Sequence, residues 1–177
     1  MNRFFGKLAM ILLVVAFPSG VMLSGAPGVW AKEKASTLVK QVQGSWTLVS
    51  VYVEQDGKKT EPFGFQPKGI VTITPDGRFS YIQLKASLPK FAADNRMKGS
   101  AEENQAIVQG SLATYGTYKV VNEKEHTVQL HIEGSTFPNW DGQDQKRTWI
   151  VKGDELTIIN PYASAGGTAY NVWKRAK

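Results

Sequence analysis

The chain has 177 residues and a formal net charge of +6, with 21 Lys and Arg against 15 Asp and Glu. This length suits one domain with a sizeable hydrophobic core. Its basic residues are scattered and cluster only near the C-terminal end, so no basic stripe indicates nucleic-acid binding. The absence of cysteine excludes disulfides and lipid attachment through an N-terminal cysteine.

The first 31 residues have the pattern of a secretory signal peptide. Arg3 and Lys7 precede an apolar run over 8–23, and small residues stand at the last and third-last positions before a cut after Ala31. An uncleaved membrane anchor fits less well, because proline and glycines interrupt a run already short for a bilayer span. We therefore expect a mature protein of residues 32–177, secreted or periplasmic, without a membrane span.

The mature chain is expected to begin with a linker or a short helix over 32–43, followed by the domain proper over 44–177. The first predicted strand, 46–55, is rich in β-branched and aromatic residues and leads into an Asp-Gly turn. Residues 70–74 and 78–84 are predicted to form a hairpin, because Pro-Asp-Gly between two alternating runs is a strong turn signal.

The pattern changes between residues 85 and 114. Ser100 begins a capping-box signature, Ser-Ala-Glu-Glu, which predicts a helix of modest quality as far as Leu112. An excursion of this length is long for a compact β domain, which favours a functional lid. The alternative is a helix that plugs one end of the fold, and the sequence does not decide between the two.

Five further strands are predicted after this excursion. Each is short, alternates in polarity and ends at turn residues, and no helix crosses between strands, so parallel winding is not expected. We therefore predict an all-β protein, an eight-stranded antiparallel barrel with one short helix inserted between strands. Such a barrel leaves room inside for one small ligand. The five strands are residues 115–121, 127–133, 145–151, 155–159 and 168–174.

Motifs along the whole domain carry a family resemblance. Gly44-Ser45-Trp46 opens the first strand, Trp173-Lys174-Arg175 closes the last, and Tyr-Gly-Thr-Tyr and His-Ile-Glu-Gly-Ser-Thr-Phe-Pro-Asn-Trp stand at 115–118 and 131–140. With these motifs the chain resembles the bacterial lipocalin-like domain family over residues 44–175. The resemblance implies a calycin-type barrel whose first-strand Trp packs at the foot beside a basic residue from the chain end. It implies structural roles for these Gly, Trp and Arg residues and no particular function, because such barrels include carriers, cyclases and isomerases.

Most of the unusual chemistry lies between His131 and Trp149. Alternation puts His131 and Glu133 on the polar face of one strand, while Arg147 and Trp149 share a face of the next. In a hairpin, His131 or Glu133 would lie across from Arg147. One interpretation turns the apolar face inward and leaves His131 and Glu133 in water. The other places His131, Glu133 and Arg147 in the lumen, where they would orient a ligand carboxylate or carbonyl.

The connection between these strands is either a structural corner or a rim that touches the ligand. Pro138, Asn139 and Gly142 are interpreted as structural, and Trp140 as a ligand contact. Further aromatic candidates to line the cavity wall are Tyr81, Tyr115, Tyr118 and Trp149.

Motifs for nucleophilic catalysis, phosphate binding and zinc proteolysis are missing. No metal or cofactor is expected, because His126 and His131 differ by an odd number of positions and face opposite sides of a strand. If the protein is an enzyme, acid–base isomerisation or cyclisation is the economical chemistry. His131 would move the proton, Glu133 would set its tautomer, and Arg147 would stabilise an enolate or carboxylate.

The leading prediction is a non-enzymatic protein that binds a small hydrophobic or amphipathic molecule with one polar end. The alternatives are the acid–base isomerase or cyclase, and a structural or partner-binding module of the cell envelope. The sequence leaves the ligand and the oligomeric state open.

Overall fold

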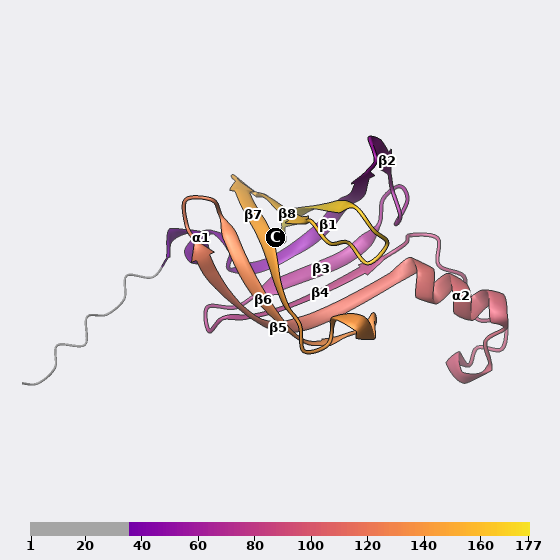
Figure 1. Ribbon diagram of the computed structural model, residues 1–177. Coiled ribbons are helices and arrows are strands. Elements are labelled where there is room, and N and C mark those ends of the chain that lie inside the picture. Colours follow the sequence, from indigo (N-terminus) through magenta and orange to yellow (C-terminus); the bar gives the residue numbers. More distant parts are fainter. Residues whose placement is uncertain (1–35) are drawn as a thin grey trace, which may run out of the picture. The chain divides into compact units, whose positions relative to one another are not determined.

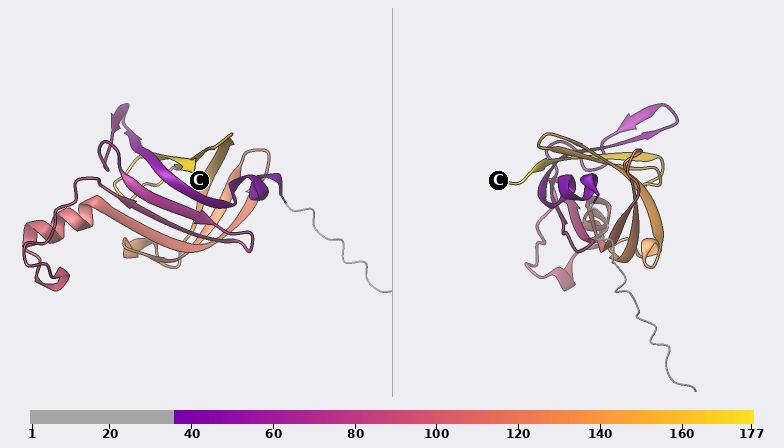
Figure 2. Two further views of the ribbon diagram at one scale, coloured as in Figure 1. Left: turned by 180° about the vertical axis from the view of Figure 1, so that it is seen from behind. Right: turned by 90° about the vertical axis from the view of Figure 1, so that its left-hand side faces the viewer.

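The computed structural model describes residues 36–177 (Figure 1). The predicted signal peptide, residues 1–31, lies outside the described residues. A single antiparallel sheet curls round until β1 pairs with both β3 and β9, which closes a barrel of eight strands (Figure 2). A ninth, short strand, β2, pairs only with the end of β1. The strands are β1 (Gly44–Gln55), β2 (Lys58–Thr60), β3 (Lys68–Ile73), β4 (Arg78–Leu84), β5 (Ser111–Asn122), β6 (Thr127–Ser135), β7 (Asp144–Lys152), β8 (Glu155–Asn160) and β9 (Thr168–Arg175).

The predicted fold class, an eight-stranded antiparallel barrel with an inserted helix, is confirmed. The helices are α1 (Thr37–Val42) and α2 (Ala101–Gly110), with 3-10 turns η1 (Arg96–Lys98) and η2 (Pro138–Trp140). The capping box at Ser100 is formed as predicted. Within residues 36–177, the helices are too short or too polar to cross a bilayer.

Two details differ from the sequence-based expectation. The sequence analysis did not predict β2. This strand has only three residues, and it pairs with the end of β1 after the Asp-Gly turn. The inserted helix ends at Gly110 instead of continuing to Leu112, and β5 begins at once. Leu112 pairs with Gln83 of β4. Pairing within the barrel thus outweighs a local sequence pattern that favoured a helix.

The foot of the barrel is closed by α1 (Figure 1). Leu38 and Val42 of this helix are buried. Ser36 caps the first turn, and Glu123 from the β5–β6 turn accepts hydrogen bonds from the Ser36 hydroxyl and from the Leu38 N–H at 2.8 Å. Trp46 at the start of β1 lies fully buried and donates its indole N–H to the Val42 carbonyl at 2.8 Å.

The last strand completes this closed end. Arg175 donates to the carbonyls of Gln43 at 3.0 Å and Gln41 at 2.9 Å, and its guanidinium carbon lies 4.0 Å from the centre of the Trp46 ring. Those carbonyls belong to the C-terminal turn of α1, where a helix leaves acceptors unsatisfied. Gly44 turns the chain into β1 with a φ of 113°, which favours glycine. The tryptophan and the C-terminal basic residue thus meet as the family resemblance implies.

The opposite end of the barrel is the mouth, formed by the connections 61–67, 85–110, 136–143 and 161–167. There α2 continues beyond the end of the barrel wall (Figure 1). Its Val108 side chain is 77% exposed. Val108 and Gln109 nevertheless line the cavity at this end, so the roles as a lid and as a plug both stay predictions.

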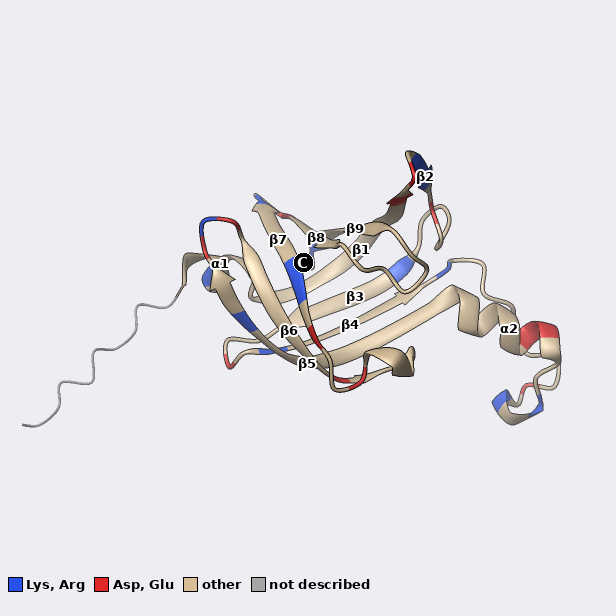
Figure 3. Cartoon of the chain, in the orientation of Figure 1, with Lys and Arg blue, Asp and Glu red and all other residues tan. Residues whose placement is uncertain are grey.

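The core follows the alternation of the strands. Along β6, Val128, Leu130 and Ile132 are buried while the residues between them are more exposed. The apolar face of this strand is therefore the inner one. Charged residues gather on turns, strand ends and α2, and acidic and basic side chains are interspersed (Figure 3).

Candidate functional site

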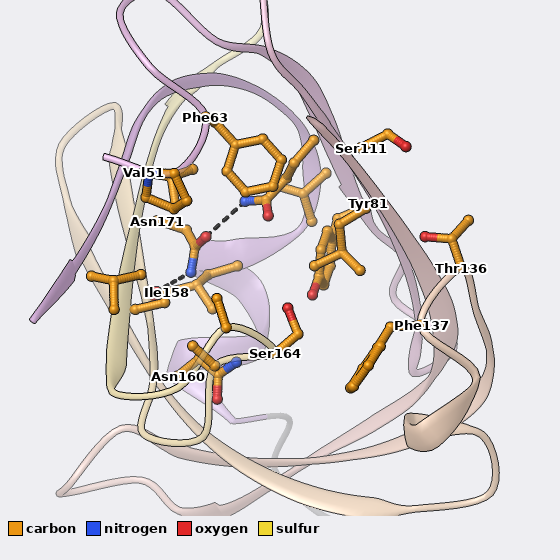
Figure 4. Close-up of a pocket in the computed structure, with 18 of the residues that line it drawn as sticks. Val51, Phe63, Tyr81, Ser111, Thr136, Phe137, Ile158, Asn160, Ser164 and Asn171 are labelled. Carbon is orange, nitrogen blue, oxygen red and sulfur yellow. Dashed lines mark hydrogen bonds between the residues drawn. The ribbon is translucent and has the colours of Figure 1, made fainter. Parts of the chain in front are cut away.

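A cavity of about 520 Å³ occupies the barrel interior on the mouth side. This volume lies within the range of about 300–1,000 Å³ that is typical of small-molecule sites. Its walls are mainly apolar, with Val51, Phe79 and Leu130 coming from β1, β4 and β6. Phe63 and Phe137 line it from two mouth connections (Figure 4). The lumen is therefore hollow, as binding of a small molecule requires.

Arg147 is the buried charge of this cavity. The fourth residue of β7, it is only 4% exposed and donates to the Lys146 carbonyl at 2.9 Å and to the side-chain oxygen of Gln145. Among residues 36–177 it forms no ion pair, and no Asp or Glu lines the cavity. Burial lowers the pKa of Arg147 to about 10, so its guanidinium still carries a positive charge at neutral pH.

The rim residue Trp140 contacts this arginine. Its ring centre lies 5.7 Å from the guanidinium carbon of Arg147, and Phe137 meets it edge-on at 5.6 Å. Pro138 begins the 3-10 turn η2, and Gly142 adopts a φ of 73° just after it. The corner is thus held by its backbone, while its two aromatic rings line the cavity.

The structure separates the three residues of the proposed acid–base group. Thr127–His131 of β6 pairs with Asp144–Thr148 of β7, so His131 lies opposite Asp144, and Arg147 lies opposite Val128. The expectation that His131 or Glu133 lies across from Arg147 is therefore wrong. The pairing is shifted by three residues relative to one that would set His131 against Arg147, and this odd shift puts the two side chains on opposite faces.

His131 and Glu133 accordingly lie on the outer surface. The His131 side chain is 52% exposed, with its Nδ1 2.8 Å from a carboxylate oxygen of Asp144, whose pKa this hydrogen bond lowers. Glu133 accepts a hydrogen bond from Arg78 at 2.6 Å. The arrangement of His131, Glu133 and Arg147 inside the lumen is thus corrected, because only Arg147 is there.

The four tyrosine and tryptophan candidates on strands also differ in whether they line the cavity. Tyr81 and Trp149 line the cavity, and burial raises the pKa of Tyr81 to about 12. Tyr118 is buried beside Trp149, with ring centres 5.2 Å apart, and its hydroxyl donates to the Thr74 carbonyl. Tyr115 is half exposed and does not line the cavity.

Three carboxamides of the lumen were not predicted as site residues: Gln83, Asn160 and Asn171. A signal for two of them was available in the alternation. Gln83 is in phase with Phe79 on β4, and Asn171 is in phase with Trp173 on β9, so each is a polar residue on an inward apolar face.

The described lining of this cavity is poor in side chains that exchange protons near neutral pH. Within the described part of the chain, the cavity lining contains no His, Cys, Asp or Glu, and no three such residues cluster as a potential metal site. The raised pKa of Tyr81 keeps its hydroxyl neutral and a poor base at neutral pH. What remains is the buried cation of Arg147, the partly buried Lys85, several neutral hydrogen-bonding groups and a large apolar surface.

A closed eight-stranded barrel with such a cavity is a calycin-like, ligand-binding fold. The chain belongs to the lipocalin-like domain family, whose profile matches residues 43–176. It is similar to the 4'-hydroxy-3'-methoxypropiophenone carrier protein of Aspergillus oryzae, with 27% identity over 90 residues, which are 47% of this chain and 81% of that protein. A crystal structure of a variant of the fluorescent protein UnaG aligns over 78% of this chain and 99% of its own, with a TM-score of 0.37 and 12% identity.

Proposed function

We propose that the protein is an exported carrier, which binds a small, mostly apolar molecule and holds an anionic or electron-rich end of it at Arg147. The observation that supports this most is a buried cation, without an acidic partner among the described residues, at the wall of an otherwise apolar cavity. Secretion or a periplasmic location is part of the proposal and is supported by the signal-peptide pattern of residues 1–31.

The energetic reason lies in the cost of burying a charge. A guanidinium removed from water loses hydration that two neutral acceptors replace only in part. A carboxylate, phenolate or polarised carbonyl on a ligand would supply charge-assisted hydrogen bonds, which are about twice as strong as neutral ones. Binding of such a group would therefore offset a cost that the empty protein carries at Arg147.

The remaining surface of the cavity favours an apolar body for the ligand. Each methylene transferred from water to such walls contributes about 0.8 kcal/mol. Two tryptophans, Trp149 and Trp173, line the deep part of the cavity, and Phe137 and Trp140 line its rim. An aromatic or long aliphatic body would contact these rings.

The similar Aspergillus protein supports the carrier interpretation. Its name states that it carries an aromatic ketone with hydroxyl and methoxy substituents. Such a molecule combines an apolar ring with electron-rich oxygens, as the cavity of this protein requires. The aromatic ketone is therefore a reasonable first compound to test.

The test measures binding of the anionic fluorophore anilinonaphthalene sulfonate, and of the aromatic ketone as its competitor, to residues 32–177. Arg147→Met is expected to weaken fluorophore binding by about tenfold or more, since a hydrogen bond to a charged group contributes about 1.5–3 kcal/mol. Lys146→Met is the matched control, because Lys146 is the exposed neighbour on the same strand. Equal affinities of wild type and Arg147→Met would refute the role of this arginine.

Native mass spectrometry of the exported protein, before and after organic extraction, complements that test. A discrete extra mass that disappears on extraction would support a carrier and give its ligand. The carrier function would be contradicted if the protein bound neither the fluorophore nor the ketone and carried no co-purified ligand.

A further inference from the structure

We infer that the cavity contains a second polar subsite, formed by Gln83, Asn171 and Asn160, which binds a neutral hydroxyl or carbonyl group of the ligand. This inference rests on the proposed carrier function and specifies its ligand. The molecule would carry two polar groups, one anionic or electron-rich at Arg147 and one neutral at the carboxamides, joined by an apolar body.

The three carboxamides come from different strands and are deeply buried. Gln83, Asn160 and Asn171 lie on β4, β8 and β9 and are 2%, 5% and 9% exposed. All three line the cavity, and Figure 4 shows Asn160 and Asn171 on one side of it. Gln83 and Asn171 are 88 positions apart in the sequence, so only closure of the barrel brings them together.

The hydrogen bonds fix the orientation of two amides. Asn171 donates through its side-chain nitrogen to the Ile158 carbonyl at 3.0 Å, and a carbonyl can only accept. Its Oδ1 therefore faces Gln83, whose Nε2 donates to it at 2.7 Å (Figure 4). This chain of two bonds leaves Oε1 of Gln83 without a hydrogen-bond partner among residues 36–177.

Asn160 supplies the complementary group. Its Oδ1 accepts the backbone N–H of Tyr162 at 2.8 Å, so its amide nitrogen is the end without a partner in the described chain. The fully enclosed side-chain atoms that lack a partner belong to Trp149 and Trp173, not to these amides. The free acceptor of Gln83 and the free donor of Asn160 thus keep accessible surface, and both residues line the cavity.

Gln83 and Asn160 lie near the mouth ends of their strands. Gln83 is the last residue but one of β4, and Asn160 is the last of β8, where both strands reach the mouth connections. A ligand that enters through the mouth would therefore reach the free groups of Gln83 and Asn160 in the same cavity as Arg147.

Such a subsite distinguishes between ligands. A simple aliphatic acid would contact the apolar walls of the cavity. It would also displace water from Gln83 and Asn160 without replacing the hydrogen bonds of that water, and this loss lowers its affinity. Sites with buried hydrogen-bonding groups discriminate strongly against analogues that lack the matching group. We therefore expect the protein to prefer a hydroxylated or oxo acid over its unsubstituted parent.

The experiment compares matched pairs of ligands on residues 32–177. Unbranched acids from hexanoic to dodecanoic acid, and the same acids with a terminal hydroxyl group, compete with anilinonaphthalene sulfonate at about pH 7. At the best-fitting length, the hydroxy acid is expected to bind wild type about tenfold more tightly than its parent. The double variant Gln83→Leu with Asn171→Leu should abolish or reverse this preference, because it removes the free acceptor of Gln83. Both residues are replaced together because losing both partners of a hydrogen bond destabilises a protein less than losing one.

Two controls and one replacement variant separate this inference from its alternatives. Gln129→Leu changes a carboxamide on the outer face of β6 and should keep the preference. Arg147→Met should weaken the binding of both acids of a matched pair about equally, so the ratio of their affinities should stay the same. If circular dichroism shows that the double variant does not fold, Asn160→Leu replaces it, with the same expected loss of preference.

The outcomes are distinct. Acids that bind wild type without any preference for the hydroxylated member, or a preference that survives in the carboxamide variants, would overturn the second subsite and leave the carrier function intact. Wild type that binds neither fluorophore nor any acid would overturn both.

Discussion

Two arginine–tryptophan pairs lie at opposite regions of this barrel. At the foot, Arg175 lies 4.0 Å from the ring of Trp46 and donates to two carbonyls at the end of α1. At the cavity, Arg147 lies 5.7 Å from the ring of Trp140 and donates only to groups of its own strand, Lys146 and Gln145.

The difference lies in what each cation compensates. Arg175 is partly exposed, keeps some hydration and satisfies helix carbonyls that would otherwise lack donors. Arg147 is buried, and its charge meets no carboxylate of the described chain. The first arginine therefore stabilises the fold, whereas the second is a cost to the fold that a ligand can offset.

The largest expected effect comes from the tryptophan at the foot. Trp46→Ala should lower the free energy of unfolding by about 3–5 kcal/mol, because it opens a cavity under α1 and removes the donor to Val42. Trp140→Ala, at the cavity rim, should cost clearly less stability and should weaken ligand binding. Urea unfolding measures both, and an equal loss in the two variants would contradict the division between foot and cavity.

The two arginines should respond differently to the same substitution. Arg175→Met should destabilise the protein by about 1–2 kcal/mol, since two helix carbonyls lose their donor. Arg147→Met should leave the free energy of unfolding within about 1 kcal/mol of wild type, or raise it, because a buried charge without an ion-pair partner is removed. Greater destabilisation by Arg147→Met would show that this arginine holds the barrel together.

The smallest expected effect is a pH dependence at the foot. Hydrogen bonds from the Ser36 hydroxyl, and then from the Leu38 N–H, lower the pKa of Glu123 from its usual value of 4.5. The unfolded chain therefore takes up this proton first, so the contribution of Glu123 is fully present above about pH 4.5 and is lost as the pH falls through the lowered pKa.

Unfolding curves of wild type and Glu123→Gln should thus differ above pH 4.5 and converge in more acidic solution. The control is Glu125→Gln, in the same turn, whose side chain forms no hydrogen bond within residues 36–177. A difference between wild type and Glu123→Gln that does not change with pH would contradict the capping role of this carboxylate.

Local patterns in the sequence were sufficient for the fold. Alternating runs and turn residues such as Pro75-Asp76-Gly77 indicated the barrel strands, and Ser100 and Glu103 indicated where the inserted helix begins. The family resemblance that Gly44, Trp46 and Arg175 help to carry implied the closed foot. These features depend on residues that are neighbours in the chain, or on motifs at its two ends, so they can be read before any strand is paired.

Strand register was the part that local patterns could not decide. His131 and Arg147 both stood on predicted strands, but a shift by an odd number of residues moves a side chain to the other face of the sheet. The observed pairing of His131 with Asp144 sends the histidine outward and Arg147 inward.

The second polar subsite needed still more of the tertiary structure. Gln83 and Asn171 lie on strands that are not neighbours in the sheet, and their side chains meet across the interior. The sequence by itself therefore predicted that a barrel forms, and the family resemblance implied which end is closed. Only the closed barrel determined which polar groups share its lumen, because that depends on contacts between residues far apart in the chain.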